Sequence, residues 1–235
     1  WRYLRLSRSP RIPALERFRP MTIPEPLRSP GRPRGGDSDC RDRLLAAAMS
    51  AFAGSGYEGA SLRAIALAAG FDVSMVAHYF GSKAELWLSV VDAAAARMQA
   101  DHDAIAAKLY APGVTAAQRL RLGVEFLFDQ IASDPRLASL VLREASGEGG
   151  EGERAACVEE RLMRPNLAFY RPLWEEAMRE GVFGESDPVV AHAAMIGAIA
   201  LLVSSRASIA RLVGREMDLA RLREEFCQGV FGREP

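Results

Sequence analysis

The chain has 235 residues, 49% of them hydrophobic and 8% aromatic, which is enough to form a core in one large or two modest domains. It contains no apolar run of roughly 18 residues, so we expect no transmembrane helix, and residues 1–36 lack the apolar stretch of a secretory signal. These features predict a cytoplasmic protein without a membrane segment.

The formal net charge of zero hides an asymmetry. Residues 1–36 hold nine arginines against Glu16 and Glu25, a net charge of +7, so the remaining residues sum to −7. The prolines and the lack of periodicity predict that this segment is a disordered basic arm, which suits a polyanionic partner. For residues 1–20 a solvated tail or a mistranslated leader is the alternative, because Met21 is a plausible start.

From about Asp37 the pattern is helical and no segment alternates with a period of two, so we predict an all-α fold. The side chains of Ser61 and Asp72 can cap helix starts, and Gly70 can end a helix. The first predicted helices cover residues 37–53, 61–69, 72–80 and 82–110. Further helices are predicted near residues 115–132, 134–146, 155–180, 188–213 and 217–231.

Residues 62–81 carry the strongest signal, because they meet the requirements of a helix-turn-helix. Ala66 provides a small residue where two helices cross, Gly70 provides the turn, and Val76 can pack back on the first helix. The residues that complete this small core are Ile65, Ala69 and Phe71. The outward face of the second helix is then free to enter a major groove of DNA.

The longer stretch 41–86 resembles the DNA-binding domain of the tetracycline-repressor family. The matching points are Ala51-Phe52, Gly56-Tyr57, Ser61, Ile65-Ala66, Ala69-Gly70-Phe71, Val76, Tyr79-Phe80 and Lys83 through Leu86. The resemblance implies a transcriptional regulator, a ligand-released homodimeric repressor that binds a near-palindromic operator in double-stranded DNA. It also implies a helix-turn-helix DNA-binding domain over residues 37–83 and a helical ligand-binding and dimerisation domain over residues 84–235.

The same resemblance assigns DNA contacts by position. Ser61 is expected to hold a phosphate, and Arg63 to reach a base edge or a phosphate. The residues expected at the DNA along the recognition helix are Asp72, Val73, Ser74, Met75, Ala77 and His78. Tyr79 and Lys83 are expected to clamp phosphates and so to set the docking angle.

Two features count against strong DNA binding by this domain alone. Ala77 stands where the family usually has a tyrosine, and residues 37–83 hold four cations against five carboxylates, a net charge of −1. A helical scaffold with a decayed DNA-binding head is therefore the alternative. Arg32 and Arg34 lie in a Gly-Arg-Pro sequence that resembles a minor-groove hook, although an ordinary Arg/Pro linker would look the same.

The last two predicted helices are the candidate dimer surface. Residues 188–213 are apolar nearly all round, and a helix of this kind is buried on more than one side. Leu219, Leu222 and Phe226 begin a matching apolar stripe on the last helix. The family arrangement is a four-helix bundle built from two chains. The alternative is a core helix that is buried within one chain.

The middle helices are expected to enclose a pocket for an unidentified small, largely apolar ligand. The candidate lining residues are Trp87, Phe126, Phe128, Phe169, Tyr170, Trp174, Met178 and Met195. Aromatic residues and methionines at helical spacing are more often plain core, so the pocket is favoured by the resemblance rather than by the pattern. The long helix from Ser82 is expected to connect this pocket to the DNA-binding domain.

Nothing in the sequence suggests catalysis, a cofactor or a metal site. No histidines form a ligand-spaced pair, and neither a nucleophile motif nor a phosphate-binding loop is present. His102 between Asp101 and Asp103 is interpreted as part of a solvated helix face, as are Glu159 and Glu160. The widely spaced Cys40, Cys157 and Cys227 are expected to be reduced and structurally incidental.

Overall fold

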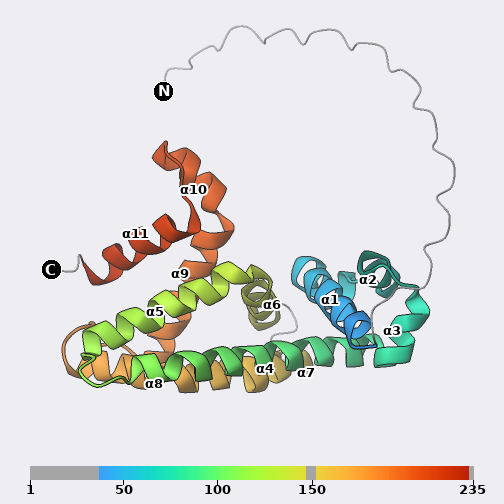
Figure 1. The fold of residues 1–235 in the computed structure, drawn as a ribbon, viewed down its shortest axis with the longest axis horizontal. Coiled ribbons are helices and arrows are strands. Elements are labelled where there is room, and N and C mark those ends of the chain that lie inside the picture. Colours follow the sequence, from blue (N-terminus) through green and yellow to red (C-terminus); the bar gives the residue numbers. More distant parts are fainter. Residues whose placement is uncertain (1–36, 147–151, 233–235) are drawn as a thin grey trace, which may run out of the picture. The chain divides into compact units, whose positions relative to one another are not determined.

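The computed structural model describes residues 37–146 and 152–232, and these ranges form helices joined by short connections (Figure 1). Within them no strand is present, which confirms the predicted all-α fold. The predicted basic arm, with Arg32 and Arg34, lies outside the described residues, and so do residues 147–151 between two of the predicted helices.

Three helices near the N-terminus form the helix-turn-helix region. They are α1 (Asp37–Gly59), α2 (Leu62–Ala69) and α3 (Val73–Phe80). The hydroxyl of Ser61 caps α2 by accepting the Ala64 N–H at 3.5 Å, and the carboxylate of Asp72 caps α3 by accepting the Ser74 N–H at 2.9 Å. The span of α1 extends past the predicted end near residue 53, but Gly56 is non-helical with φ 73° and ψ 172°, so two helical segments meet there at a kink.

The remaining helices form the body of the molecule. They are α4 (Lys83–Leu109), α5 (Ala116–Ser133), α6 (Pro135–Ser146), α7 (Glu153–Val158), the π-helical η1 (Glu159–Met163), α8 (Arg164–Arg179), α9 (Pro188–Ser204), α10 (Arg206–Val213) and α11 (Leu219–Phe231). Reciprocal capping boxes begin two of them: Ser82 with Glu85 at α4, and Thr115 with Gln118 at α5. Most predicted helices are found within a residue or two of their expected ends.

Two departures from regular helix were not predicted. Residues 155–180 were expected as one α-helix, but a π-helical turn occupies Glu159–Met163 just before Pro165, whose missing N–H cannot complete a regular ladder there. Residues 188–213 were expected as one helix too, but the chain breaks at Ser205 and α9 and α10 meet at 73°. The expectation of a single helix over 188–213 was therefore wrong.

Buried side chains gather in two clusters. The first contains Phe52, Val76 and Trp87, and it also includes Leu140 from α6 and Val158 from α7. The second lies among α5, α8, α9 and α11, with Phe128, Tyr170, Trp174 and Ile199 among its members. The domain boundary expected between residues 83 and 84 stays a prediction. α4 runs continuously across it, and the first cluster takes side chains from helices on both sides.

Within the described ranges no helix, taken singly, is long and apolar enough to cross a bilayer. The bent pair α9 and α10 reaches the necessary length and composition only when the two helices are counted together.

Candidate DNA-binding head and ligand-sensing body

The core of the helix-turn-helix is packed as the sequence predicts. Ile65, Ala66 and Val76 are almost completely buried. Gly70 adopts φ 79°, a left-handed conformation that favours glycine, and ends α2. The next N–H, of Phe71, returns to the carbonyl of Ala66 at 2.9 Å, so the turn is closed by hydrogen bonds of a Schellman type.

One face of α3 is open to solvent. Val73 is 42% exposed, and Ser74, Ala77 and His78 are exposed as well. Met75 is half-buried against the first cluster, so only part of its side chain is available to bases. Tyr79 is also half-buried, and its ring meets the edge of His78 with centroids 4.9 Å apart. The outward face of α3 is thus small, neutral and partly apolar.

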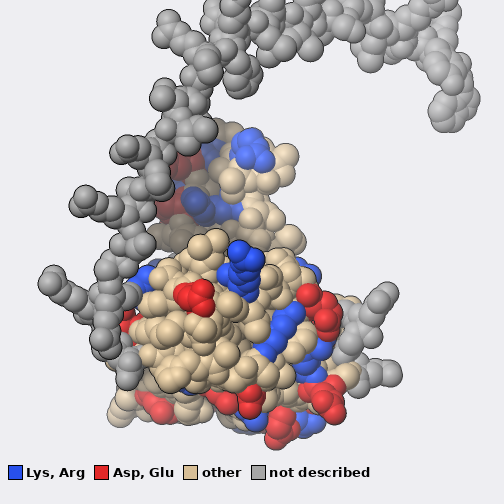
Figure 2. Space-filling model, turned by 90° about the vertical axis from the view of Figure 1, so that its right-hand side faces the viewer, with Lys and Arg blue, Asp and Glu red and all other residues tan. Residues whose placement is uncertain are grey.

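Lys83 and Arg43, two cations near this face, are held by local contacts. Nζ of Lys83 lies 3.3 Å from the Glu58 carbonyl and 4.7 Å from the centroid of the Tyr57 ring. Cζ of Arg43 lies 4.8 Å above the Phe71 ring. The hydrogen bonds from Ser74 lower the pKa of Asp72, which keeps a negative charge at the tip of α3. Figure 2 views the molecule from the side of α3, and charges of both signs are scattered there without one basic patch.

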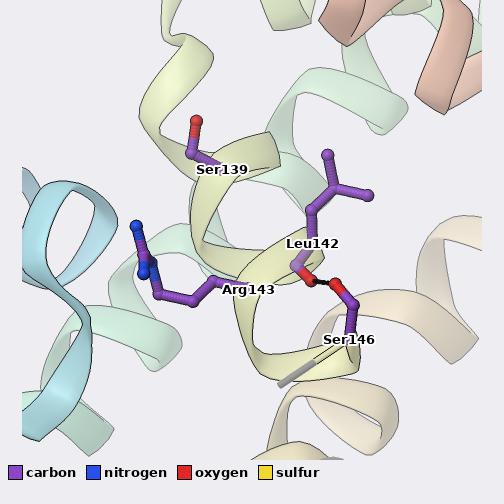
Figure 3. A pocket seen from close by; sticks show the side chains of 4 residues that line it. All are labelled: Ser139, Leu142, Arg143 and Ser146. Carbon is purple, nitrogen blue, oxygen red and sulfur yellow. Dashed lines mark hydrogen bonds between the residues drawn. The ribbon is translucent and has the colours of Figure 1, made fainter.

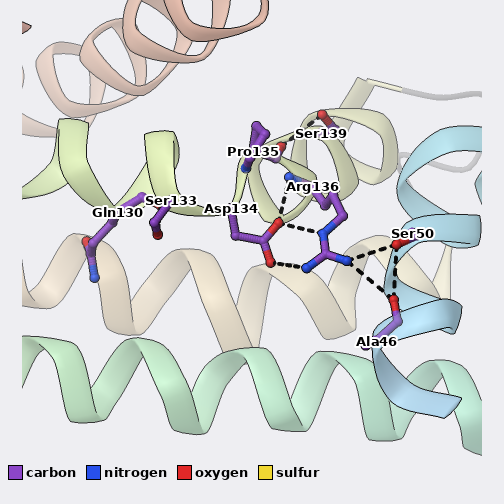
Figure 4. Close-up of polar contacts among 8 residues, drawn as sticks. All are labelled: Ala46, Ser50, Gln130, Ser133, Asp134, Pro135, Arg136 and Ser139. Atoms are coloured by element: carbon purple, nitrogen blue, oxygen red, sulfur yellow. Dashed lines mark hydrogen bonds and ion pairs between the residues drawn. The ribbon is translucent and has the colours of Figure 1, made fainter. Parts of the chain in front are cut away.

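Helix α6 is bonded to α1 at two points. The Arg136 guanidinium makes two 2.7 Å bonds to the Asp134 carboxylate and donates from Nη1 to Oγ of Ser50 at 2.8 Å (Figure 4). The hydrogen bond from Arg136 lowers the pKa of Asp134, so the pair stays charged. About two turns further along α6, Nη2 of Arg143 donates to the Gly54 carbonyl at 3.1 Å, and Arg143 also lines a shallow hollow on α6 (Figure 3).

These bonds make α6 a second connection between the body and the helix-turn-helix region of α1, α2 and α3, which we call the head. From the sequence, the long helix that became α4 was expected to play that part. A third link comes from α7, where Cζ of Arg154 lies 4.4 Å from the Tyr57 ring and its Nε lies 3.3 Å from the Glu144 carboxylate. Glu144 is buried, so Arg154 is the cation that balances it.

Most of the predicted ligand-lining residues lie together in the second cluster. Phe128, Tyr170, Trp174 and Met195 are buried there, and Phe126, Phe169 and Met178 pack against it. Trp87 is the exception. It belongs to the first cluster and meets the edge of the Tyr57 ring, with centroids 6.4 Å apart. Trp87 instead lines a separate cavity of about 370 Å³ with Tyr57, Leu88, Arg154 and Cys157.

Polar side chains cross the second cluster, and the sequence pattern did not predict them. His192 accepts from Nε1 of Trp174 at 3.4 Å and its Nε2 lies 3.2 Å from Oδ1 of Asn166. Because indole only donates, Nδ1 of His192 is the acceptor and Nε2 carries the proton. Burial lowers the pKa of His192 to about 4, so this imidazole is neutral.

His102 was interpreted as part of a solvated helix face, and that interpretation was wrong. Its side chain is 2% exposed, because α4 turns it inward in a stripe with Met98, Ile105 and Leu109. The spacing i, i+4, i+7 and i+11 of this stripe is the signal that could have revealed it. The flanking Asp101 and Asp103 are poor guides, since adjacent residues on a helix face different directions.

Comparisons with known proteins agree with this geometry. A relative from Pseudomonas putida, the HTH-type transcriptional repressor NicS, is 27% identical over 153 residues, which cover 65% of this chain and 69% of NicS. The model of bacterial regulatory proteins of the tetR family matches residues 44–90, which run from α1 into α4. Residues 44–90 form a DNA-binding domain of the tetR family. The chain is a DNA-binding transcriptional regulator.

Several solved structures share the fold of this chain. The fatty acid degradation regulator FadR of Bacillus halodurans covers 86% of this chain and 97% of its own, with a TM-score of 0.59 at 23% identity. AibR, solved with isovaleryl coenzyme A and operator DNA, covers 83% and 100%, with a TM-score of 0.63 at 14% identity. FadR of Bacillus subtilis, solved with stearoyl-CoA, covers 82% and 99%, with a TM-score of 0.57 at 20% identity.

A set of large apolar side chains is exposed on the last helices of the chain. Leu201 on α9 is 66% exposed. The other members of this set are Val189, Val190, Leu212, Val213 and Leu219. The predicted helix over 188–213 was expected to be buried on more than one side, and within a single chain this face has no cover.

Proposed function

We propose that this regulator is a homodimeric repressor that binds a near-palindromic operator and releases it when a small acyl compound enters the body. The observation that carries the proposal is the open face of α3, presented by a packed helix-turn-helix. A single α3 reads few bases, whereas two copies spaced by one turn of DNA read a near-palindrome. The relative NicS, which is a repressor, supports the sign of regulation.

The DNA contacts follow from the exposed positions. Val73 and Ala77 would meet bases through apolar contact, such as thymine methyl groups, while Ser74 and His78 would hydrogen-bond. Ser61 and Arg63 would hold phosphates from the start of α2. The contacts assigned to Met75, Tyr79 and Lys83 require side chains that now pack inward, so each would reorient on DNA. From the arm, Arg32 and Arg34 would enter the neighbouring minor groove.

The exposed apolar side chains of α9, α10 and α11 support a dimer. A face of this kind is costly in water and is covered when a second copy packs against it around a two-fold axis. Two helices from each chain would then form the four-helix bundle of the family.

Replacing Leu201 by arginine is expected to raise the dissociation constant of the dimer by roughly a hundredfold, because the two-fold axis buries an unpaired charge twice. Sedimentation velocity over a dilution series measures it. Leu142→Arg on α6 is the control, since Leu142 is exposed but lies outside the proposed face. If both variants stay dimeric, the dimer uses another surface.

An acyl compound is proposed as the ligand because AibR and the Bacillus subtilis FadR were solved with acyl-CoA molecules. The mainly aliphatic and aromatic second cluster suits an apolar chain. Such a ligand releases DNA only if it binds the free dimer more tightly than the DNA-bound dimer. The helices α4 and α6 would carry that difference to the head.

The experiment that tests the proposal is selection of bound fragments from a random DNA library by the purified full chain. We expect one near-palindromic sequence, bound by two chains. A library that shows no enrichment would favour the alternative, a helical scaffold with a decayed head. That alternative rests on Ala77 and on the net charge of −1 over residues 37–83.

A further inference from the structure

One buried histidine of the body lacks the hydrogen bond that such a group normally has. His102 on α4 stacks on the Phe169 ring, with centroids 4.0 Å apart and planes within 1°. The edge of the Tyr170 ring closes another side, with centroids 5.7 Å apart. Within the described residues Nε2 of His102 is buried and has no hydrogen-bond partner. An unsatisfied buried group of this kind destabilises the fold.

The second buried histidine shows what a structural role looks like. Both nitrogens of His192 are used, one by Trp174 and the other by Asn166. The Tyr170 ring lies against His192, with centroids 4.8 Å apart, so the two imidazoles flank one phenol. The hydroxyl of Tyr170 donates to Oε1 of Gln130 at 3.4 Å. In this row His102 alone keeps an unused ring nitrogen.

We infer that Nε2 of His102 anchors the ligand by donating a hydrogen bond to the uncharged carbonyl oxygen of that ligand. This inference rests on the proposed function. The residues that stack on or bond to the two imidazoles are the uncharged Phe169, Tyr170, Trp174 and Asn166.

The surroundings select an uncharged group over a carboxylate. The charges that act on His102 come from Asp101 and Asp103, and both would repel an anion. A buried carboxylate would need a paired cation, whereas an ester or thioester carbonyl needs only one donor. The ligand class is therefore an acyl group in ester or thioester form, not a free fatty acid.

The position of His102 also connects a bound ligand to the DNA-binding head. α4 begins at Lys83, beside the helix-turn-helix, and runs without a break past His102. A ligand that bonds to His102 therefore acts on the same rigid helix that carries Lys83. The coupling expected of α4 would then start at one specific point, which is the hydrogen bond between the ligand and His102.

Two matched variants separate this role from a structural one. His102→Phe keeps the stack on Phe169 and removes the unsatisfied nitrogen, so the melting temperature of the free protein should stay equal or rise. His192→Phe leaves two partners unpaired and should lower the melting temperature by roughly 5 °C. A fall as large in His102→Phe as in His192→Phe would make His102 a structural residue and overturn the inference.

Calorimetric titration with a series running from isovaleryl-CoA to stearoyl-CoA tests the ligand contact. For the acyl-CoA that binds best, its thioether analogue, which lacks the carbonyl, should bind the wild-type chain about tenfold more weakly. His102→Phe should bind both compounds equally, at the weaker level.

The outcomes distinguish the inference from the proposed function. Acyl-CoA binding that is unaffected by the thioether change and by His102→Phe would overturn the inference and leave the proposed function standing. If no member of the series binds the wild-type chain while selective DNA binding persists, the acyl ligand class is wrong. The inferred hydrogen bond from His102 is then wrong as well.

Discussion

Replacing Trp174 by alanine is expected to lower the free energy of unfolding by about 3–5 kcal/mol, the range for large aromatic side chains removed from a core. Trp174 is 0% exposed and lies at the centre of the second cluster. Its loss leaves a cavity and also leaves Nδ1 of His192 without a donor. Urea unfolding followed by circular dichroism at a fixed protein concentration measures the change.

Leu67→Ala is the control for this experiment. Leu67 on α2 is 77% exposed, so its truncation should change the free energy of unfolding by no more than about 0.5 kcal/mol. A cost below about 1 kcal/mol for Trp174→Ala would contradict the packing of the second cluster around α8. It would also remove the structural role assigned to His192.

Replacing Val76 by aspartate is expected to abolish specific DNA binding, with an affinity loss of at least about a hundredfold. Val76 is completely buried where α3 packs on α2, and an unpaired carboxylate at that place costs several kcal/mol. The head should therefore lose its fold. The melting temperature of the chain should fall as well, because the first cluster extends from the head to Leu140 and Val158 in the body. Fluorescence anisotropy on selected DNA and thermal melts measure both effects.

The neighbouring Ala77→Asp makes the same chemical change on the exposed face of α3. It should leave the melting temperature unchanged and still weaken DNA binding by about tenfold, because the new charge faces phosphates. The loss should depend on salt, unlike that of Val76→Asp. Unchanged DNA affinity in Ala77→Asp would mean that this face of α3 does not lie in the groove.

The head could be predicted from sequence because its determinants are local. Gly70 marks the turn by its need for a positive φ, and Ser61 and Asp72 mark the helix starts by their capping side chains. Spacing within one helix pair then fixes Ala66 and Val76 in the core. None of these inferences requires knowledge of a distant segment.

The parts that could not be predicted depend on long-range contacts or on weak local signals. The uniformly apolar sequence of 188–213 has no periodicity that changes at Ser205, so it does not indicate the break between α9 and α10. The guanidinium of Arg206 bonds to the Met217 carbonyl at 3.0 Å, and this contact lies outside that segment. The bonds of Arg136 to Ser50 and of Arg143 to Gly54 join segments far apart in the chain. Periodicity says which face of a helix is buried, but not which helix covers it.

Lys83 shows why a resemblance alone does not locate a contact. Its position matches that of a phosphate clamp, yet its ammonium group lies on the Tyr57 ring and the Glu58 carbonyl. Binding to DNA must replace both contacts, and the gain is the attraction of a phosphate at an otherwise neutral face. Lys83 is therefore the side chain whose removal most directly reports whether the head docks as proposed.

The measurement that tests the central claim most directly is fluorescence anisotropy with the selected fragment and a scrambled one, at two salt concentrations, for the wild-type chain and Lys83→Ala. We expect tight binding of the selected fragment only, a decline with salt, and a loss of about tenfold in Lys83→Ala with a shallower salt slope. Weak binding that is equal for both fragments and unchanged by Lys83→Ala would contradict the account, and the scaffold interpretation would replace it.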